Sequence, residues 1–122
     1  MSHLFSFEKL DVYQRSREFV REIYKLTSDF SKDEKFGIIS QIRPAVISIP
    51  NNLAEGSGRT SGKGQAEFTR YSYASLMEVL NLLTLSNDLK LISGESYQNL
   101  RLFIQELSNK LNSLRKSQLG RK

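Results

Sequence analysis

Apolar residues recur at helical spacing in four stretches of the chain. In the first stretch, residues 12–30, the seam positions step alternately by four and three residues, at Val12, Ser16, Phe19, Ile23, Leu26 and Phe30. Such steps place side chains on one face of an α-helix, whereas a strand requires alternation with a period of two. No stretch shows that alternation. The pattern therefore predicts a helix here and an all-α protein.

The second stretch keeps the same register through both prolines of the chain, with seam positions at Ile39, Ile42, Val46, Ile49 and Leu53. An interior proline lacks an amide and crowds the carbonyl four residues before it, at a cost of about 3 kcal/mol if nothing compensates. Pro44 and Pro50 lie off the seam, so the pattern favours one proline-bent helix. A helix that restarts with Pro44 or Pro50 in its first turn is the alternative.

Polar and small residues mark the ends of this second helix. Ser31 and Glu34 have the spacing of a capping box, which predicts a helix start at that point. Gly56 is expected to end the helix as a left-handed cap. The connection that follows, GSGRTSGKG (56–64), contains four glycines and two cations. It lacks the residue order and the preceding strand of a phosphate-binding P-loop.

The third helix is expected from about Gln65 to Ile92, and its apolar residues cover most of its circumference. A helix that is apolar on most sides is covered on most sides. A small bundle cannot supply all of that cover, so we expect Leu76, Leu80 and Leu83 to form a subunit interface.

The fourth helix follows a break at Gly94 and has its seam at Tyr97, Leu100, Ile104, Leu107, Leu111 and Leu114. Four helices with short connections favour antiparallel neighbours. The sequence therefore predicts an up-down-up-down four-helix bundle formed by residues 1–114, followed by a basic tail at 115–122.

Composition excludes several classes of protein. The chain has 122 residues, of which 39% are hydrophobic and 25% charged, as in one soluble domain. It contains no apolar run long enough for a membrane span and no cysteine, and its first residues do not resemble a secretory signal. We therefore expect a cytoplasmic protein without disulfides or thiolate metal sites.

The net charge of +5 lies mainly in residues 115–122, RKSQLGRK, which hold four cations and no anion. Such a segment attracts nucleic acid, although basic tails also serve only to solubilise. Arg59 and Lys63 add two cations just before a helix N-terminus, where free amides can meet a phosphate. A plain turn between helices is the other interpretation of that loop.

A row of Arg17, Arg21 and Lys25 follows the first helix, off its seam, with Glu18 and Glu22 beside it. The glutamates lie within reach of Arg21 and Lys25 three residues on, which indicates a solvated, salt-bridged face. A stripe of phosphate contacts is the alternative.

Candidate catalytic residues are scarce. His3 is the only histidine, so neither a Glu-x-x-His metal site nor a serine–histidine pair can be assembled. Asn51, Asn52 and Glu55 crowd the end of the second helix, where such residues cap, hold the loop or face another subunit. We expect no enzyme, no cofactor, no metal and no small-molecule substrate.

Residues 41–59, QIRPAVISIPNNLAEGSGR, resemble the pattern Q-x-R-R-A-x-x-S-I-x-x-N-I-A-E-G-x-x-R of the four-helix proteins encoded in 23S rRNA intervening sequences, often labelled S23 ribosomal proteins. The matching positions are Gln41, Arg43, Ala45, Ser48, Ile49, Asn52, Ala54, Glu55, Gly56 and Arg59. The segments FEKLDVYQRS (7–16) and EFTRYSYASLMEVLNLL (67–83) are also similar to that family. A proline at the position of Pro50 is familiar there, whereas Pro44 replaces a second basic residue.

The resemblance implies a four-helix subunit that assembles, with a homopentamer favoured. A similar bundle occurs in the accessory variability proteins of diversity-generating retroelements, which assist a reverse transcriptase and contact nucleic acid. We therefore expect a non-enzymatic oligomer that associates with RNA or DNA through backbone electrostatics. The candidate contacts are Arg43, Arg59, Lys63, Arg115, Lys116, Arg121 and Lys122. The motif residues expected to be structural are Gln41, Pro50, Asn52, Glu55 and Gly56. A protein-interaction scaffold, or an accessory subunit that does not touch nucleic acid, is the alternative.

Overall fold

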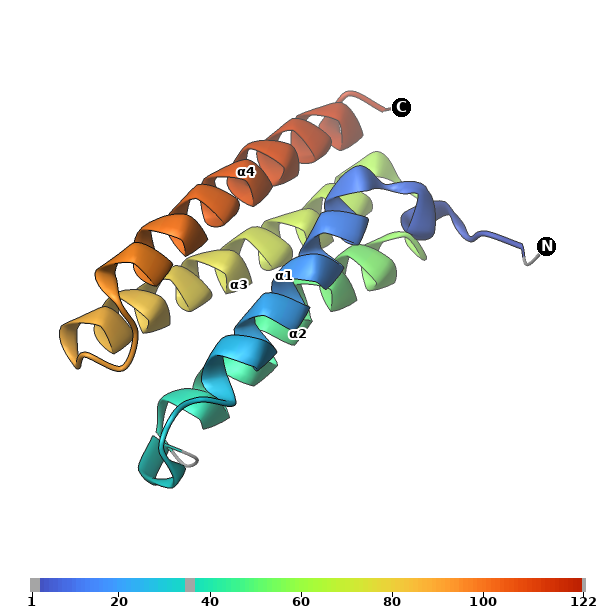
Figure 1. Ribbon diagram of the computed structural model, residues 1–122. Coiled ribbons are helices and arrows are strands. Elements are labelled where there is room, and N and C mark those ends of the chain that lie inside the picture. Colours follow the sequence, from blue (N-terminus) through green and yellow to red (C-terminus); the bar gives the residue numbers. More distant parts are fainter. Residues whose placement is uncertain (1–2, 35–36, 122) are drawn as a thin grey trace.

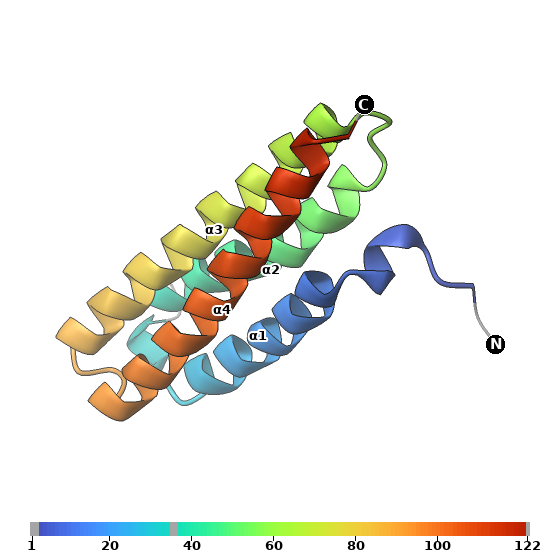
Figure 2. The same cartoon turned by 90° about the horizontal axis from the view of Figure 1, so that it is seen from above.

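The computed structural model describes residues 3–34 and 37–121, and these ranges contain helices and no strand. The elements are the 3-10 helix η1 (Ser6–Lys9), α1 (Asp11–Thr27), the 3-10 helix η2 (Lys32–Glu34), α2 (Ile38–Gly56), α3 (Gly62–Asp88) and α4 (Gly94–Leu119). Each α-helix packs against the next along the chain, and α1 also packs against α4 (Figures 1 and 2). The predicted all-α, antiparallel four-helix bundle is confirmed.

The core is built from the apolar seams of all four helices. Its largest fully buried side chains are Phe19, Ile23, Ile42, Ile49, Leu76, Leu83, Leu107 and Leu111. Burial of a side chain of this size contributes about 1.5–3 kcal/mol. Phe19 of α1 and Phe103 of α4 bring their ring centroids to 5.0 Å. The four 4–3 registers in the sequence therefore define the bundle interior.

α2 is continuous from Ile38 to Gly56 with both prolines inside it, which confirms one helix rather than two. Pro44 is exposed and Pro50 is partly buried. Both lie outside the core, as their places off the seam predict. The two proline rings therefore lie on the side of α2 that faces away from the core.

α2 begins at Ile38, seven residues after the predicted start. The Ser31–Glu34 spacing instead makes a turn, in which the amide of Glu34 donates to the carbonyl of Ser31 at 3.0 Å. The carboxylate of Glu34 accepts a long hydrogen bond of 3.5 Å from the amide of Ile38. The N-cap position of α2 is Gly37, which has no side-chain cap, so the predicted capping box does not start this helix.

Gly56 ends α2 as predicted, but not as a left-handed cap, because Ser57 follows with φ −63° and no glycine has a positive φ in the described ranges. A Cβ at position 56 would lie 2.8 Å from the Cβ of Phe68 on α3. α2 and α3 also lie close together one turn further along, where the hydroxyl of Ser72 on α3 donates to the carbonyl of Ile49 on α2 at 2.8 Å. Gly56 is therefore a packing glycine.

α3 ends at Asp88, four residues before the predicted end. Lys90 adopts a left-handed conformation with φ 60°, and the amide of Leu91 donates to the carbonyl of Ser86 at 2.9 Å. This is the hydrogen bond of a Schellman turn, formed here with lysine where glycine is usual. Gly94 does not break α3 but is the first residue of α4, which Ser93 caps.

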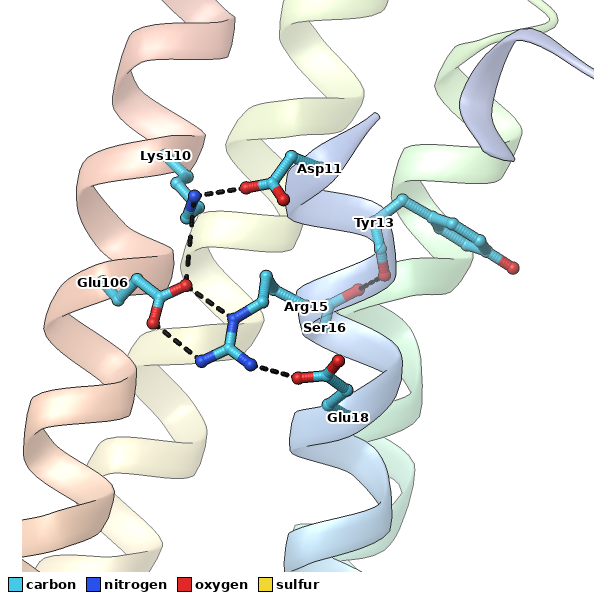
Figure 3. A network of polar contacts seen from close by, with 7 residues as sticks. All are labelled: Asp11, Tyr13, Arg15, Ser16, Glu18, Glu106 and Lys110. Atoms are coloured by element: carbon cyan, nitrogen blue, oxygen red, sulfur yellow. Dashed lines mark hydrogen bonds and ion pairs between the residues drawn. The ribbon is translucent and has the colours of Figure 1, made fainter. Parts of the chain in front are cut away.

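An ion-pair network on the surface joins α1 to α4 (Figure 3). Nε and Nη2 of Arg15 donate to the two carboxylate oxygens of Glu106 at 2.6 and 2.8 Å. Lys110 lies 3.9 Å from Glu106 and pairs with Asp11, while Glu18 pairs with the far side of Arg15. The hydrogen bonds from Arg15 lower the pKa of Glu106, and the same contact raises the pKa of Arg15. The two hydrogen bonds from one guanidinium to one carboxylate set the position of α1 along the bundle axis relative to α4.

Candidate functional site

The connection from α2 to α3 and the C-terminal end of α4 meet at one end of the bundle (Figure 1). A Cβ at Gly62, the first residue of α3, would overlap the carbonyl oxygen of Gln118 and lie 2.9 Å from the Cβ of Arg121. Only glycine permits this approach. Two segments that are far apart in the sequence therefore form one surface.

Two side-chain hydrogen bonds hold the end of α4 in place. Gln118 is 7% exposed, and its Oε1 accepts a hydrogen bond of 2.6 Å from the hydroxyl of Thr69. Nη1 of Arg121 donates to Oε1 of Gln65 at 2.5 Å. Residues 115–119 thus continue α4, whereas the sequence suggested a separate tail from residue 115. Arg121 is therefore held against α3.

The candidate cations gather on this surface. Arg59, Lys63, Lys116 and Arg121 are exposed there, and Arg115 is partly buried on α4. Lys122 lies outside the described residues. The Cζ atom of Arg59 sits 4.7 Å from the centre of the Phe68 ring, an arrangement that orients a guanidinium without neutralising it. Lys63 lies in the first turn of α3, beside the helix N-terminus. The spacing in sequence did not reveal this convergence.

Charge is distributed unevenly between the two ends of the bundle. Among the described residues, segments 55–63 and 115–121 contain five Lys or Arg and one Glu, whereas segments 28–34 and 87–96 at the other end contain two Lys and five Asp or Glu. Residues 3–11, at the basic end, add one Lys and two acids. Glu67, near this end, is paired with Arg70, whose hydrogen bond lowers the pKa of Glu67. The basic end therefore attracts anions, and the other end repels them.

Arg43 does not belong to this surface, and its predicted contact with nucleic acid needs correction. Its Nε donates to the hydroxyl of Thr27 at 3.0 Å, and its Nη2 donates to the carbonyl of Tyr24 at 3.4 Å. The guanidinium carbon also lies 4.4 Å from the centre of the Tyr24 ring. Arg43 is partly buried between α1 and α2, where its hydrogen bonds are used to join the two helices.

The other motif residues are arranged along α2. Gln41 and Glu55 are exposed, Asn52 is partly buried, and its Nδ2 donates to the carbonyl of Ser48 at 2.8 Å. Glu55 and Arg59 are four residues apart, but an ion pair between them is not among those formed in the part of the chain that the structure describes.

Two of the three leucines expected at a subunit interface are core residues instead. Leu76 and Leu83 have no exposed surface in the single chain. The bundle itself covers these sides of α3, for which we expected a second subunit. Leu80 is partly exposed and lines a hollow between α3 and α4.

Neither a metal cluster nor a membrane helix is found in the described ranges. No group of three or more His, Asp or Glu side chains there has the arrangement of a metal site. None of the helices within those ranges is long and apolar enough to cross a bilayer.

Residues 8–113 match the family described as 23S rRNA-intervening sequence protein. The chain belongs to this family. Its fold is also similar to the crystal structure of a protein of unknown function from the S23 ribosomal protein family of Bacteroides thetaiotaomicron VPI-5482, with a TM-score of 0.75 and 22% identity. That match covers 86% of this chain and 98% of the other. Neither description names an enzymatic activity. No curated protein matches the chain.

For this member of the 23S rRNA-intervening sequence family, sequence reasoning missed the residues that assemble the basic end. Gln118 continues the 4–3 register of α4 one step beyond Leu114, so the helical period could have predicted that position 118 is buried. The prediction was missed because glutamine is polar and the other residues of this seam are apolar or aromatic. The role of Gly62 had no local signal, because its partner lies more than fifty residues away.

Proposed function

We propose that this protein is a non-enzymatic homo-oligomer of the cytoplasm that associates with RNA or DNA, and that the basic end of the bundle contacts the phosphate backbone. The observation that carries the proposal is the contact between Gly62 and the backbone of Gln118. It joins Arg59 and Lys63 to Arg121 in one cationic surface.

The surface suits backbone contact better than base readout. Its groups are flexible cations around a helix N-terminus, and phosphate oxygens are the acceptors that such groups bind. Binding of this kind releases counterions, so the affinity falls steeply with salt and depends little on sequence. An oligomer of parallel subunits would present several copies of the surface to one strand, which raises the apparent affinity without new contacts.

The test is a titration of the purified protein into a structured fragment of rRNA at several salt concentrations. The variant Arg59→Gln/Lys63→Gln/Arg121→Gln removes three cations from the basic end. The matched control, Lys25→Gln/Lys32→Gln/Lys90→Gln, removes three cations from the opposite half of the bundle. We expect the first variant to bind more weakly, with a salt slope reduced by about one for each phosphate that the protein no longer neutralises. We expect the control to keep its slope.

Equal effects of the two variants would show that only net charge matters, and a flat salt response would overturn the proposal.

A protein-interaction scaffold is the second candidate, and one hollow favours it. This hollow of about 430 Å³ between α3 and α4 is lined by Met77, Leu80 and Leu102, and Leu102 is 67% exposed. Absence of RNA and DNA binding at low salt would favour the scaffold.

A further inference from the structure

A groove runs between α1 and α2 on the outside of the bundle. It consists of two adjoining hollows of about 270 and 220 Å³ that share Tyr13, Ile47 and Pro50. The remaining lining residues are Phe7, Arg17, Val20, Arg21, Asn51 and Ala54. Ile47, a large aliphatic side chain in the middle of α2, is 42% exposed. The floor of the groove is therefore apolar and uncovered in the single chain.

The groove carries positive charge without a compensating acid. Arg17 and Arg21 are exposed at its rim, one helical turn apart, and none of the described residues that line it is Asp or Glu. Neither arginine belongs to an ion pair formed within the described ranges. Nη1 of Arg17 donates only to Oε1 of Gln14 at 3.1 Å. The salt-bridged face predicted for this row does not form, so the groove suits an occupant with an apolar side and a carboxylate.

The same chain presents such an occupant on the outer side of α3. A stripe with steps of three and four residues is exposed there, at Tyr71, Ala74, Glu78, Asn81 and Leu85. Tyr71 is 40% exposed, and Glu78 belongs to no ion pair within those same ranges. We call these five residues the α3 stripe. It offers an aromatic ring, a small residue and a carboxylate along one line.

Contacts between α2 and α3 show that the groove and the α3 stripe lie at the same level along the bundle axis. The hydroxyls of Ser48 and Ser75 are hydrogen-bonded, and Gly56 packs against Phe68. The groove-lining part of α2, residues 47–54, therefore lies alongside α3 residues 68–75. Tyr71 and Ala74 fall within that span, and Glu78 lies one turn beyond it. Arg21 shares its hollow with Ile47, which places it toward the same end as Glu78.

We propose that a second copy of this chain docks its α3 stripe in the α1–α2 groove, with Glu78 against Arg21 and Tyr71 near Pro50. This interface rests on the oligomeric part of the proposed function and specifies its contact surfaces. Two subunits side by side in the same orientation bring the patches together, because their heights agree. The two patches differ, so the contact is heterologous, and its repetition closes a ring or extends a filament. Parallel subunits would place all basic ends on one side.

A charge-swap experiment tests the interface, with the assembly mass measured by light scattering after gel filtration. Arg21→Glu and Glu78→Arg each set like charges against one another, and we expect either variant to raise the concentration needed for assembly at least about tenfold. The combined variant, Arg21→Glu/Glu78→Arg, reverses the pair within each chain and should recover most of the assembly. All of these positions are exposed in the subunit, so thermal unfolding of the single chain should change little.

Lys25→Glu is the matched control, because Lys25 lies one turn beyond Arg21 on the same helix but lines a different hollow, between α1 and α4. It should leave the mass unchanged. A monomeric wild-type protein, equal effects of Arg21→Glu and Lys25→Glu, or no recovery in the combined variant would overturn the interface. The RNA titration on the same samples separates the two proposals. Assembly without RNA binding would refute only the nucleic-acid role, and RNA binding by a monomer would refute only the interface.

Discussion

Gly62 at the start of α3 lies directly against the backbone of Gln118 near the end of α4. The contact leaves no space for a Cβ at position 62, and the nearest backbone atoms belong to the other helix, which cannot give way as a side chain would. The first turn of α3 and the last turn of α4 therefore hold each other at fixed distance. The candidate cations of the basic end are arranged by this contact.

Replacement of Gly62 by alanine should push the two helices apart. We expect the free energy of unfolding to fall by about 1–3 kcal/mol, as for an overpacked core position, although alanine is the better helix former. RNA affinity should fall with it, because Arg121 would move away from Lys63. Urea unfolding and the rRNA titration measure the two effects.

Gly94 provides the control for this substitution. It is also the first residue of its helix after a serine cap, but a Cβ there would meet nothing within 4 Å. Gly94→Ala should be neutral or stabilise by up to about 1 kcal/mol. A loss of stability in Gly94→Ala comparable to that in Gly62→Ala would contradict the packing explanation.

Removal of residues 115–122 should destabilise the fold, because residues 115–119 form the last part of α4. The truncation exposes the hydroxyl of Thr69, which now donates to buried Gln118. Loss of that hydrogen bond and of the packing around it should lower the free energy of unfolding by about 1–3 kcal/mol. Truncation after Gly120 should have little effect on urea unfolding, since Gln118 remains. Identical unfolding curves for both truncations would show that the end of α4 is dispensable.

The sequence predicted those features of the structure that depend on neighbouring residues in the chain, and it missed those that depend on contacts between helices. The apolar registers are local, and they predicted all four helices and their buried faces. The exact ends depend on contacts across the bundle, so they were predicted less well. α3 ends through a left-handed Lys90 rather than at a glycine. The burial of Leu76 and Leu83 likewise required knowing how completely the neighbouring helices cover α3.

The candidate site was predicted as a set of residues but not as a surface. The cationic segments around Arg59 and Arg121 are visible in the sequence, yet their proximity follows from contacts between α3 and the end of α4, at Gly62 and at Gln65. Arg43 belonged to the resembling motif, and nothing in the motif distinguishes a guanidinium facing solvent from one bonded to Thr27. Charge in a sequence identifies candidates, and only packing decides which of them are free.

Acid should weaken the attachment of α1 to α4. Arg15 holds the pKa of Glu106 below its usual value, so the pair stabilises the fold fully above about pH 5 and loses its effect as the pH falls through the lowered pKa. At pH 7, Glu106→Gln should cost about 0.5–1 kcal/mol, since both partners are about one-third exposed. The difference from wild type should shrink as the pH falls through the lowered pKa of Glu106. Urea unfolding over a series of pH values from 7 downward, with hydrogen exchange of α1 amides, measures it.

Glu67→Gln is the comparison for this pH effect. The pKa of Glu67 is also lowered, by Arg70 three residues on in the same helix. Such a pair lies within one helix and joins no helix to another. Its loss should leave hydrogen exchange in α1 unchanged. Faster exchange of α1 amides in Glu67→Gln would mean that the α1–α4 network is not what holds α1.

Pro44→Ala should stabilise α2. Pro44 is exposed in a helix that continues on both sides of it, so alanine restores an amide opposite the carbonyl of Ser40 without loss of core packing. We expect a gain of up to about 3 kcal/mol in urea unfolding. A decrease would show that the bundle requires the backbone geometry that Pro44 imposes.

The alternation of helix direction has a consequence for how this fold diverges. In an antiparallel bundle the backbone dipoles of neighbouring helices oppose one another and largely cancel. The difference in charge between the two ends of the subunit therefore comes from surface side chains, at positions that the core does not constrain. A handful of substitutions at the two ends could erase or reverse that polarity while every buried residue stayed the same. Within such a scaffold, affinity for polyanions can be gained and lost in evolution without any change of fold.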